Sequence, residues 1–454
     1  PKCAKYWPDE SAKYNNLTVI LEATQRLADF THRTFRLQEE ESHDIRIVSL
    51  FHFTVWPDFG VPMYATAVLS FLKCVKASNP PHAGPMVVHC SAGVGRTGTF
   101  IVIDSMLDMI KAEGKVNIFD FVKRIRSQRI NMVQVLDQYT FIYEAVLEAS
   151  LCGDTSISTS DYRIKLYKLK QINSRTNQNA IFQEFQNLSV VCPVPEPDEC
   201  QAGHVAENRA KNRFPNIIPV DQYRPYLMNH EDSEDNYINA SFLDAYKQKN
   251  AFLATQMPLP NTIDHFWRMI HNYKSCSIVM LNAMDKTDES LGQYWPDEGS
   301  LEFGPFTVEL VSNSNYGGII CRILKLYPTG YKEGDNIRTV QQFFLTCWPL
   351  GHEVPQSKPA VMDLVSLVEK WQQKTGNGPI TVHCLNGLGR SGTFCALYAV
   401  IERIKVEQVV DVFQAVKKLR INRPNMVQNL DQYNFCYDAV LEFLDSFEAY
   451  ANFK

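Results

Sequence analysis

The chain has 454 residues, of which 45% are hydrophobic and 21% are charged, and its formal net charge is −5 at pH 7. This balance is typical of globular domains, and the length allows two or three of them. A net negative charge argues against general binding to nucleic acid or to acidic membranes, which requires basic patches. It leaves room for a small local anion site.

The cysteines and the apolar runs limit the cellular setting. Twelve cysteines are spread along the chain without Cys-x-x-Cys pairs, which predicts reduced and mostly buried thiols. No apolar run reaches the ~18 residues of a membrane span, and no signal peptide is visible. Because the first residue is Pro1 rather than Met, we expect a piece of a longer protein, so the lack of a membrane span here says little about the parent protein.

The chain contains an internal repeat, the first thing to look for in a sequence of this length. Segment 87–100, VVHCSAGVGRTGTF, matches segment 381–394, TVHCLNGLGRSGTF, and their cysteines lie 384 − 90 = 294 positions apart. Segment 130–148 matches segment 424–442 at the same offset. Two further blocks match in the same order at offsets of 292 (Trp56 and Trp348) and 288 (YWPDE at 6–10 and 294–298), so the nearly constant offset indicates a duplicated domain.

The first copy lacks the beginning of the second. The second copy contains KNRFPNIIPVD at 211–221 and DNYINASF at 235–242, and the counterparts of both would precede residue 1. We therefore expect residues 1–150 to be the C-terminal half of one domain and residues 161–454 to be a whole one. The small, polar segment 151–160 is the predicted linker.

The predicted elements follow the same order in both copies. In the first copy the pattern predicts strands at 15–26 and 45–55, and a further strand in the apolar run that leads into His89. Helices are predicted at 97–114, 118–129 and 136–149. The second copy repeats this pattern, with a strand before His383 and helices at 391–407, 411–421 and 430–448. The fold class is therefore α/β, a mixed twisted sheet flanked by helices in two tandem copies, the first incomplete.

The motif HCSAGVGRTG places Cys90 and Arg96 at the two ends of a short loop with two glycines. Such a loop ahead of a helix can turn its backbone N–H groups inward and form an anion cradle. The same amides favour a thiolate, so we expect a Cys90 pKa well below the usual ~8.5. Arg96 adds a planar, charged fork for two phosphoryl oxygens. The loop residues expected to bind the anion are Ser91, Ala92, Gly93, Val94 and Gly95.

Two neighbours complete the predicted cradle. The hydroxyl of Thr97 can donate to the sulfur, and we expect His89 to bond backbone near the loop and hold the cysteine in place. A Cys-x5-Arg spacing alone is a weak signal, and an isolated cysteine is most often a buried, inert thiol. The full motif disfavours that alternative. A nucleotide P-loop is also disfavoured, because it requires a lysine that this loop lacks.

On these motifs the whole chain resembles the cytoplasmic tandem domains of receptor-type protein tyrosine phosphatases. The runs FVKRIRSQRINMVQ and FEAYANFK are most similar to the alpha/epsilon branch, from which HCLNG in the second copy departs. The resemblance implies the tyrosine-phosphatase fold and hydrolysis of phosphotyrosine in proteins through a cysteinyl-phosphate. It also implies a place on the cytoplasmic side of the plasma membrane, as the intracellular part of a single-pass receptor. The resemblance leaves open contacts between the two domains, or between two copies of the whole chain in a homodimer.

The resemblance suggests roles outside the loop. A departing tyrosyl oxygen has a conjugate-acid pKa of ~10 and needs a proton donor. Asp58 in WPDFGVP is the candidate general acid and base, although an aspartate beside Pro and Gly is often a plain turn residue. Gln134, with Gln138 one helical turn later, would position the hydrolytic water, while the alternative for both is surface solvation. Lys2 matches a family loop near the aspartate. We expect no metal and no other cofactor, because Arg96 and the loop amides neutralise the phosphoryl charge.

The second copy keeps the cradle residues but departs from the pattern elsewhere. Cys384, Arg390 and Gln428 are retained, so an anion could still bind. Leu350 replaces the general acid, and loss of such an acid typically lowers the rate by ~10²–10⁴. The other departures are Phe214 for a tyrosine, Asn216 for an aspartate, Leu385-Asn386 for Ser-Ala, and Ser290 opposite Lys2. We expect a folded, weak or inactive domain with a regulatory or binding role.

A second function remains open for the chain as written. Residues 1–150 lack half of their domain, and a catalytic loop must be held within ~0.5 Å. If the first copy does not hold its loop, the chain would act as a phosphotyrosine-binding or scaffolding module.

Overall fold

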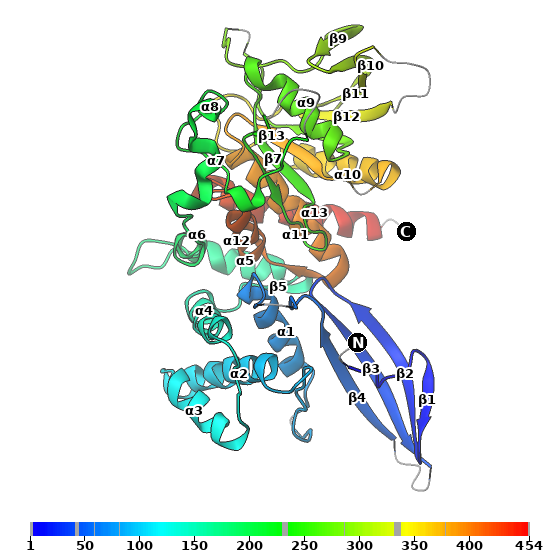
Figure 1. The fold of residues 1–454 in the computed structure, drawn as a ribbon, viewed down its shortest axis with the longest axis vertical. Coiled ribbons are helices and arrows are strands. Elements are labelled where there is room, and N and C mark those ends of the chain that lie inside the picture. The colour runs from blue at the N-terminus through cyan, green and yellow to red at the C-terminus, as the bar shows by residue number, and fades with distance from the viewer. Residues whose placement is uncertain are drawn as a thin grey trace. The chain divides into compact units, whose positions relative to one another are not determined.

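The computed structural model describes residues 3–40, 45–58, 60–80, 82–228, 235–285, 287–330, 337–376 and 378–452 (Figure 1). The chain divides into two compact units, Pro1–Asp154 and Thr155–Lys454. Lys2 lies outside the described residues.

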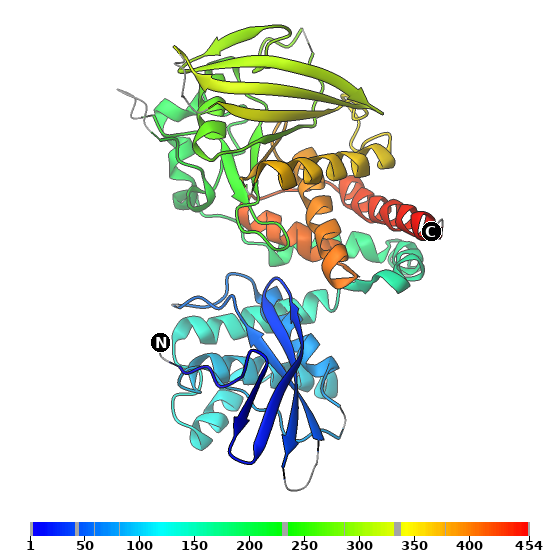
Figure 2. The same ribbon diagram turned by 90° about the vertical axis from the view of Figure 1, so that its right-hand side faces the viewer.

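The first unit packs four helices beside a small antiparallel sheet (Figure 2). Its strands run in the order β1-β2-β3-β4, with bounds Ser11–Tyr14, Leu17–Arg26, Phe30–Glu39 and Ile45–Phe53. Its helices are α1 (Ala65–Ala77), α2 (Gly95–Glu113), α3 (Ile118–Gln128) and α4 (Leu136–Cys152). Aromatic rings join the two layers, since Phe71 of α1 lies edge-on to Phe53 at 5.2 Å and to Phe30 at 5.3 Å. The predicted helices of the first copy are confirmed.

The second unit is built on an eight-stranded mixed sheet, which confirms the predicted fold class. The strand order is β6-β7-β13-β8-β12-β11-β10-β9. The three parallel pairs all involve β13 or β8, while the remaining pairs are antiparallel. The strands are β6 (Ala240–Leu243), β7 (Phe252–Gln256), β8 (Ser277–Met280), β9 (Ser300–Phe303), β10 (Phe306–Tyr316), β11 (Ile319–Pro328), β12 (Arg338–Leu345) and β13 (Ile380–Cys384). A separate pair joins β5 (Ile157–Ser158) to β14 (Val409–Val410).

Helices surround this sheet. Those before it in the chain are α5 (Tyr162–Lys170), α6 (Ala180–Val191), α7 (Gln201–His204) and α8 (Ala206–Arg209), and α9 (Ile263–Asn272) follows β7. Those after β12 are α10 (Lys358–Thr375), α11 (Gly389–Glu407), α12 (Val412–Asn422) and α13 (Leu430–Asn452). Short 3-10 turns are η1 (Thr159–Asp161), η2 (Pro197–Cys200), η3 (Asp221–Tyr223) and η4 (Pro260–Thr262).

The sequence repeat is also a structural repeat. The elements β9 to β12 and α10 to α13 recur in the first unit as β1 to β4 and α1 to α4. Even an irregularity recurs: β2 has a β-bulge between Leu21 and Ala23, and β10 has one between Leu310 and Ser312. Bulges twist a strand locally and act as fixed features of a sheet.

One predicted strand is wrong. In the second unit the residues before the cysteine form β13, which lies between β7 and β8 and bonds to both. In the first unit residues 83–90 form no strand, and Val87 is 87% exposed. The described part of the first unit contains no counterpart of β7 or β8. A strand needs partners for its backbone groups, so the same β-prone sequence stays irregular here.

A helix face that is covered in the second unit is open in the first. In the second unit α6 packs against α12 and α13, and the ring of Phe185 lies 5.0 Å from the Arg420 guanidinium and 5.4 Å from the Tyr433 ring. The counterpart surface between α3 and α4 is a groove of about 510 Å³. Its wall includes Phe119, which is 65% exposed, whereas the matching Phe413 is fully buried.

This difference predicts that the same substitution lowers the free energy of unfolding by unequal amounts in the two copies. Phe413→Ala should destabilise the chain by about 3–5 kcal/mol, because it empties a packed core site. Phe119→Ala should stay within about 0.5 kcal/mol, as for other exposed positions. Urea unfolding of the full chain measures both. Equal costs would mean that the α3–α4 groove is filled in solution.

Candidate active site

The Cys90 loop wraps the sulfur in backbone amides at the start of α2. Gly93 has a φ of +70°, which glycine adopts without strain, and its N–H donates to Cys90 Sγ at 3.2 Å. Burial raises the pKa of the Cys90 thiol, but the nearby side chain and amide of Thr97 and the amides of Gly93 and Val94 outweigh it. The pKa falls from its ordinary value of 9.0 to about 7. A large share of Cys90 is therefore a thiolate at neutral pH.

The loop has the same shape in both copies, although only one is preceded by a strand. Gly387 has a φ of +69°, against +70° at Gly93. The residue before each helix also matches, with φ −128° and ψ −62° at Val94 and φ −123° and ψ −71° at Leu388. The shape of the loop is therefore set locally, by its own residues and the helices around it.

Arg129 holds the outer side of the loop. It caps the C-terminal end of α3, where its Nε donates to the Gly93 carbonyl at 2.9 Å and its Nη2 donates to the Ala92 carbonyl at 3.1 Å. Holding these carbonyls on the outside leaves the neighbouring N–H groups free to face the sulfur. The counterpart Arg423 likewise donates to the Gly387 carbonyl, at 3.1 Å.

A strained turn between α3 and α4 brings both predicted glutamines to the loop. Val133 has a φ of +61°, which is costly for a β-branched residue. Arg126 stabilises the turn by donating to the Val133 carbonyl at 2.5 Å. A Cβ on Gly95 would lie 2.9 Å from Gln138 Nε2 and 3.3 Å from Gln134 Oε1, so both carboxamides pack closely against this glycine. The backbone N–H of Gln134 in turn donates to Gln138 Oε1 at 2.9 Å.

Arg96 connects the cradle to the segment that carries Asp58. From the first turn of α2, its Nη2 donates to the Pro57 carbonyl at 2.9 Å, and its guanidinium lies 5.8 Å from the Trp56 ring. The Trp56 indole closes the turn by donating to the Gly60 carbonyl at 3.2 Å. The side chain of Asp58 is exposed at this turn.

His89 is held by a residue that the sequence analysis did not single out. Its Nε2 lies 2.7 Å from the hydroxyl of Tyr6, a side-chain partner in place of the expected backbone one. His383 and Tyr294 form the same pair at 2.7 Å. Tyr6, Arg126 and Arg129 were all missed as site residues. The available signal was their identity in both copies, within YWPDE and the Arg-rich run before NMVQ.

The second cradle is more enclosed than the first. Cys384 is 2% exposed, and Arg390 donates to four backbone carbonyls, those of Leu281, Trp348, Pro349 and His352. Leu350, in the place of Asp58, is 72% exposed and offers no proton donor. The backbone N–H of Gln428 donates to Gln432 Oε1 at 2.9 Å, as that of Gln134 does to Gln138 Oε1. Gln428 therefore keeps the position of Gln134.

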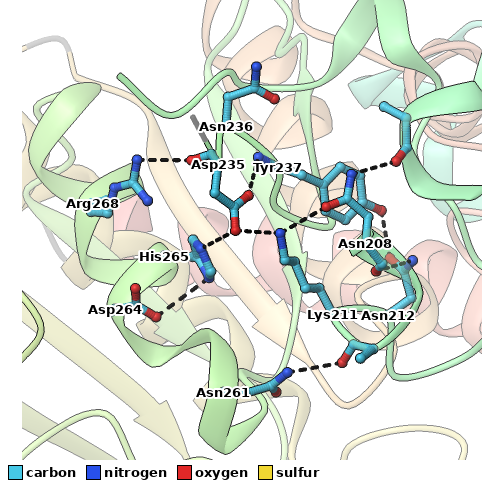
Figure 3. A network of polar contacts seen from close by, with 12 residues as sticks. Asn208, Lys211, Asn212, Asp235, Asn236, Tyr237, Asn261, Asp264, His265 and Arg268 are labelled. Carbon is cyan, nitrogen blue, oxygen red and sulfur yellow. Dashed lines mark hydrogen bonds and ion pairs between the residues drawn. The ribbon is translucent and has the colours of Figure 1, made fainter. Parts of the chain in front are cut away.

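A polar network braces the second unit's KNRFPN segment, which carries Phe214 and Asn216 (Figure 3). Lys211 forms an ion pair with Asp235, whose carboxylate also lies 3.1 Å from His265 Nε2. Asn212 accepts a hydrogen bond from the Tyr237 hydroxyl at 2.6 Å. Ser290, opposite Lys2 in the alignment of the copies, accepts from Arg213 Nη1 at 2.6 Å. The described residues of the first unit contain no counterpart of this segment.

The described residues contain neither a membrane-spanning helix nor a metal-binding cluster. No helix there has the length and apolar character needed to cross a bilayer. No three His, Cys, Asp or Glu side chains among them are grouped so that they could hold a metal ion.

Comparison with known proteins places the two copies in one family. The sequence model described as protein-tyrosine phosphatase matches residues 1–148 and 208–442. Receptor-type tyrosine-protein phosphatase epsilon from Homo sapiens is 46% identical over 462 residues, covering the whole chain and 65% of that protein. The alpha protein from Mus musculus is 45% identical over 461 residues, covering the whole chain and 55% of that protein. Receptor-type tyrosine-protein phosphatase U from Gallus gallus is 43% identical over 450 residues, covering 98% of the chain and 31% of that protein. The resemblance drawn from the motifs is confirmed, and the chain spans about a third to two thirds of the length of these relatives.

The contacts of Arg129 predict a positioning role that can be measured at the sulfur. Arg129→Met should loosen the loop and raise the Cys90 pKa towards its ordinary value, because the amides lose their alignment. A rise of about one unit lowers the thiolate fraction at pH 7 about fivefold. Peptide-resolved alkylation rates of Cys90 measure this fraction. The control is Arg124→Met on the same helix, an exposed arginine stacked on Phe121. Equal rates in the two variants would rule out the role.

Proposed function

The chain belongs to the protein-tyrosine phosphatase family, and from this membership we propose that its first unit hydrolyses phosphotyrosine in proteins. The observation that carries the proposal is the loop amide of Gly93, which donates to Cys90 Sγ at 3.2 Å. Such contacts lower the pKa of the thiol to about 7 and make it a nucleophile at neutral pH. Arg96 follows six residues later in the first turn of α2. A thiolate that accepts from an inward amide, in a loop that ends in an arginine, suits attack on a phosphoryl group.

The first step transfers the phosphoryl group to sulfur. The Cys90 thiolate attacks phosphorus, an S–P bond forms, and the P–O bond to the tyrosyl oxygen breaks. Asp58 gives its proton to that oxygen, so tyrosine leaves neutral. Arg96 and the amides of the loop from Ser91 to Gly95 bind the phosphoryl oxygens throughout, and Thr97 stabilises the sulfur.

The second step releases phosphate. Water attacks phosphorus, its proton passes to Asp58, and the S–P bond breaks to restore the thiolate. Gln134 and Gln138, which pack against Gly95 beside the loop, orient this water. Amide side chains suit the task because they orient water without adding charge next to the phosphoryl group.

We further propose that the second unit is weak or inactive and serves a regulatory or binding role. Leu350 cannot give or take a proton, and Phe214 and Asn216 depart from the pattern of active members. The names of the relatives, receptor-type phosphatases, support a place for this chain in the intracellular part of a receptor. Its substrates would then be phosphotyrosine proteins at the inner face of the plasma membrane.

A second candidate function rests on one observation in the first unit. Residues 83–90 form no strand, so the Cys90 loop lacks the support that β13 gives the second loop. On this reading the chain binds phosphotyrosine without turning it over. The amide hydrogen bond to Cys90 Sγ favours the enzyme, because it is present although no strand precedes the loop.

Turnover of a chromogenic aryl phosphate by the full chain distinguishes the two functions. Cys90→Ser should reduce turnover to background, because the alcohol is not ionised at neutral pH. Asp58→Asn should lower kcat by about 10²–10⁴, as for loss of a general acid. Cys384→Ser is the matched control and should retain the rate of the unmodified chain. Turnover that is absent in the unmodified chain, or that depends on Cys384, would contradict the proposal.

A further inference from the structure

The side chain of Asn386 folds back across the second phosphate loop. Its Oδ1 accepts a hydrogen bond from the Cys384 thiol, with sulfur and oxygen 3.4 Å apart, and another from the Leu388 amide at 3.0 Å. Its Nδ2 donates to Gln428 Oε1 at 3.0 Å. One carboxamide thus contacts the cysteine, a loop amide and the glutamine at once.

The first loop has no such side chain at the matching position. Ala92 stands in the place of Asn386 and has no polar side chain. The amide of Val94, the counterpart of Leu388, acts on the Cys90 sulfur and lowers its pKa. In the second loop the matching amide is taken by a carbonyl oxygen, which carries partial negative charge and competes for the same donor as an anion would.

The guanidinium of the second site is also occupied. Arg390 donates to the carbonyls of Leu281 at 3.0 Å, Trp348 at 2.7 Å, Pro349 at 2.9 Å and His352 at 3.3 Å. In the described structure of the first unit Arg96 makes one such bond, to Pro57. A bound anion would have to displace several of these carbonyls and the Asn386 carboxamide.

We propose that Asn386 is an internal ligand that closes the second site to tetrahedral oxyanions. Its carboxamide oxygen accepts the hydrogen bonds of the Leu388 amide and the Cys384 thiol, so neither donor is left for an anion. Its nitrogen donates to Gln428, the glutamine that would otherwise face water. The block acts on binding, and so it goes beyond the loss of the general acid at Leu350. The presence of Cys384 and Arg390 is therefore not sufficient for phosphate binding.

Tungstate, a tetrahedral dianion, tests the proposal by calorimetric titration of the full chain. Arg96→Ala serves as the background, because it removes the clamp of the first site. Adding Asn386→Ala should tighten tungstate binding about 10- to 100-fold, the value of hydrogen bonds to a charged group. Adding Arg390→Ala as well should abolish the gain, which assigns the binding to the second loop.

Two further variants keep the test decisive. Leu385→Ala removes the neighbouring bulky side chain and should bring no gain, which separates occupation of the donors from simple bulk. Asn386→Ser replaces the carboxamide with a short side chain and should reproduce the gain if Asn386→Ala does not fold. The proposal fails if neither folded Asn386 variant binds tungstate more tightly, if Leu385→Ala gives an equal gain, or if the Arg96→Ala background already binds tungstate through Arg390. None of these outcomes involves turnover at Cys90, so they leave the proposed function unaffected.

Discussion

The backbone N–H groups that face the Cys90 sulfur are the interaction on which the rest of the first site depends. Together with the Thr97 side chain, they lower the pKa of the thiol to about 7 against the opposing effect of burial. The same amides would bind phosphoryl oxygens, so one arrangement of a short loop makes both the nucleophile and its anion cradle. Gly93 in the left-handed region and Arg129 on the outer carbonyls keep the amides in that arrangement.

Two copies of one sequence pattern in different surroundings separate local from global causes of structure. The loop keeps its dihedral angles in both units, because its glycine, its arginine brace and its helix are all present in each. The strand before it forms only where β7 and β8 provide partners. The face of α12 is buried only where α6 covers it. Local geometry therefore persists in the first unit while longer-range packing is lost, which exposes Val87 and Phe119.

The parts of the structure that could be predicted are those with a local cause. The helices after each Gly-rich loop follow from apolar spacing, and the cradle follows from glycines placed between Cys90 and Arg96. The strand before His89 could not be predicted correctly, because its propensity is real but the described residues of the first unit offer it no partner strand. Tyr6 and Arg129 meet the loop from distant parts of the chain, so spacing gave no indication of them. Asn386 differs again: its bulk was evident from the sequence, but its bonds to the loop donors depend on a rotamer.

The most direct test is a pH titration of Cys90 in the intact chain, in which the alkylation rate of the peptide that contains Cys90 is measured at each pH. We predict half-maximal thiolate at a pH of about 7. An inflection near the ordinary value of 9.0 would mean that the loop amides do not face the sulfur in solution. In that case neither the nucleophile nor the cradle described for the first unit would exist.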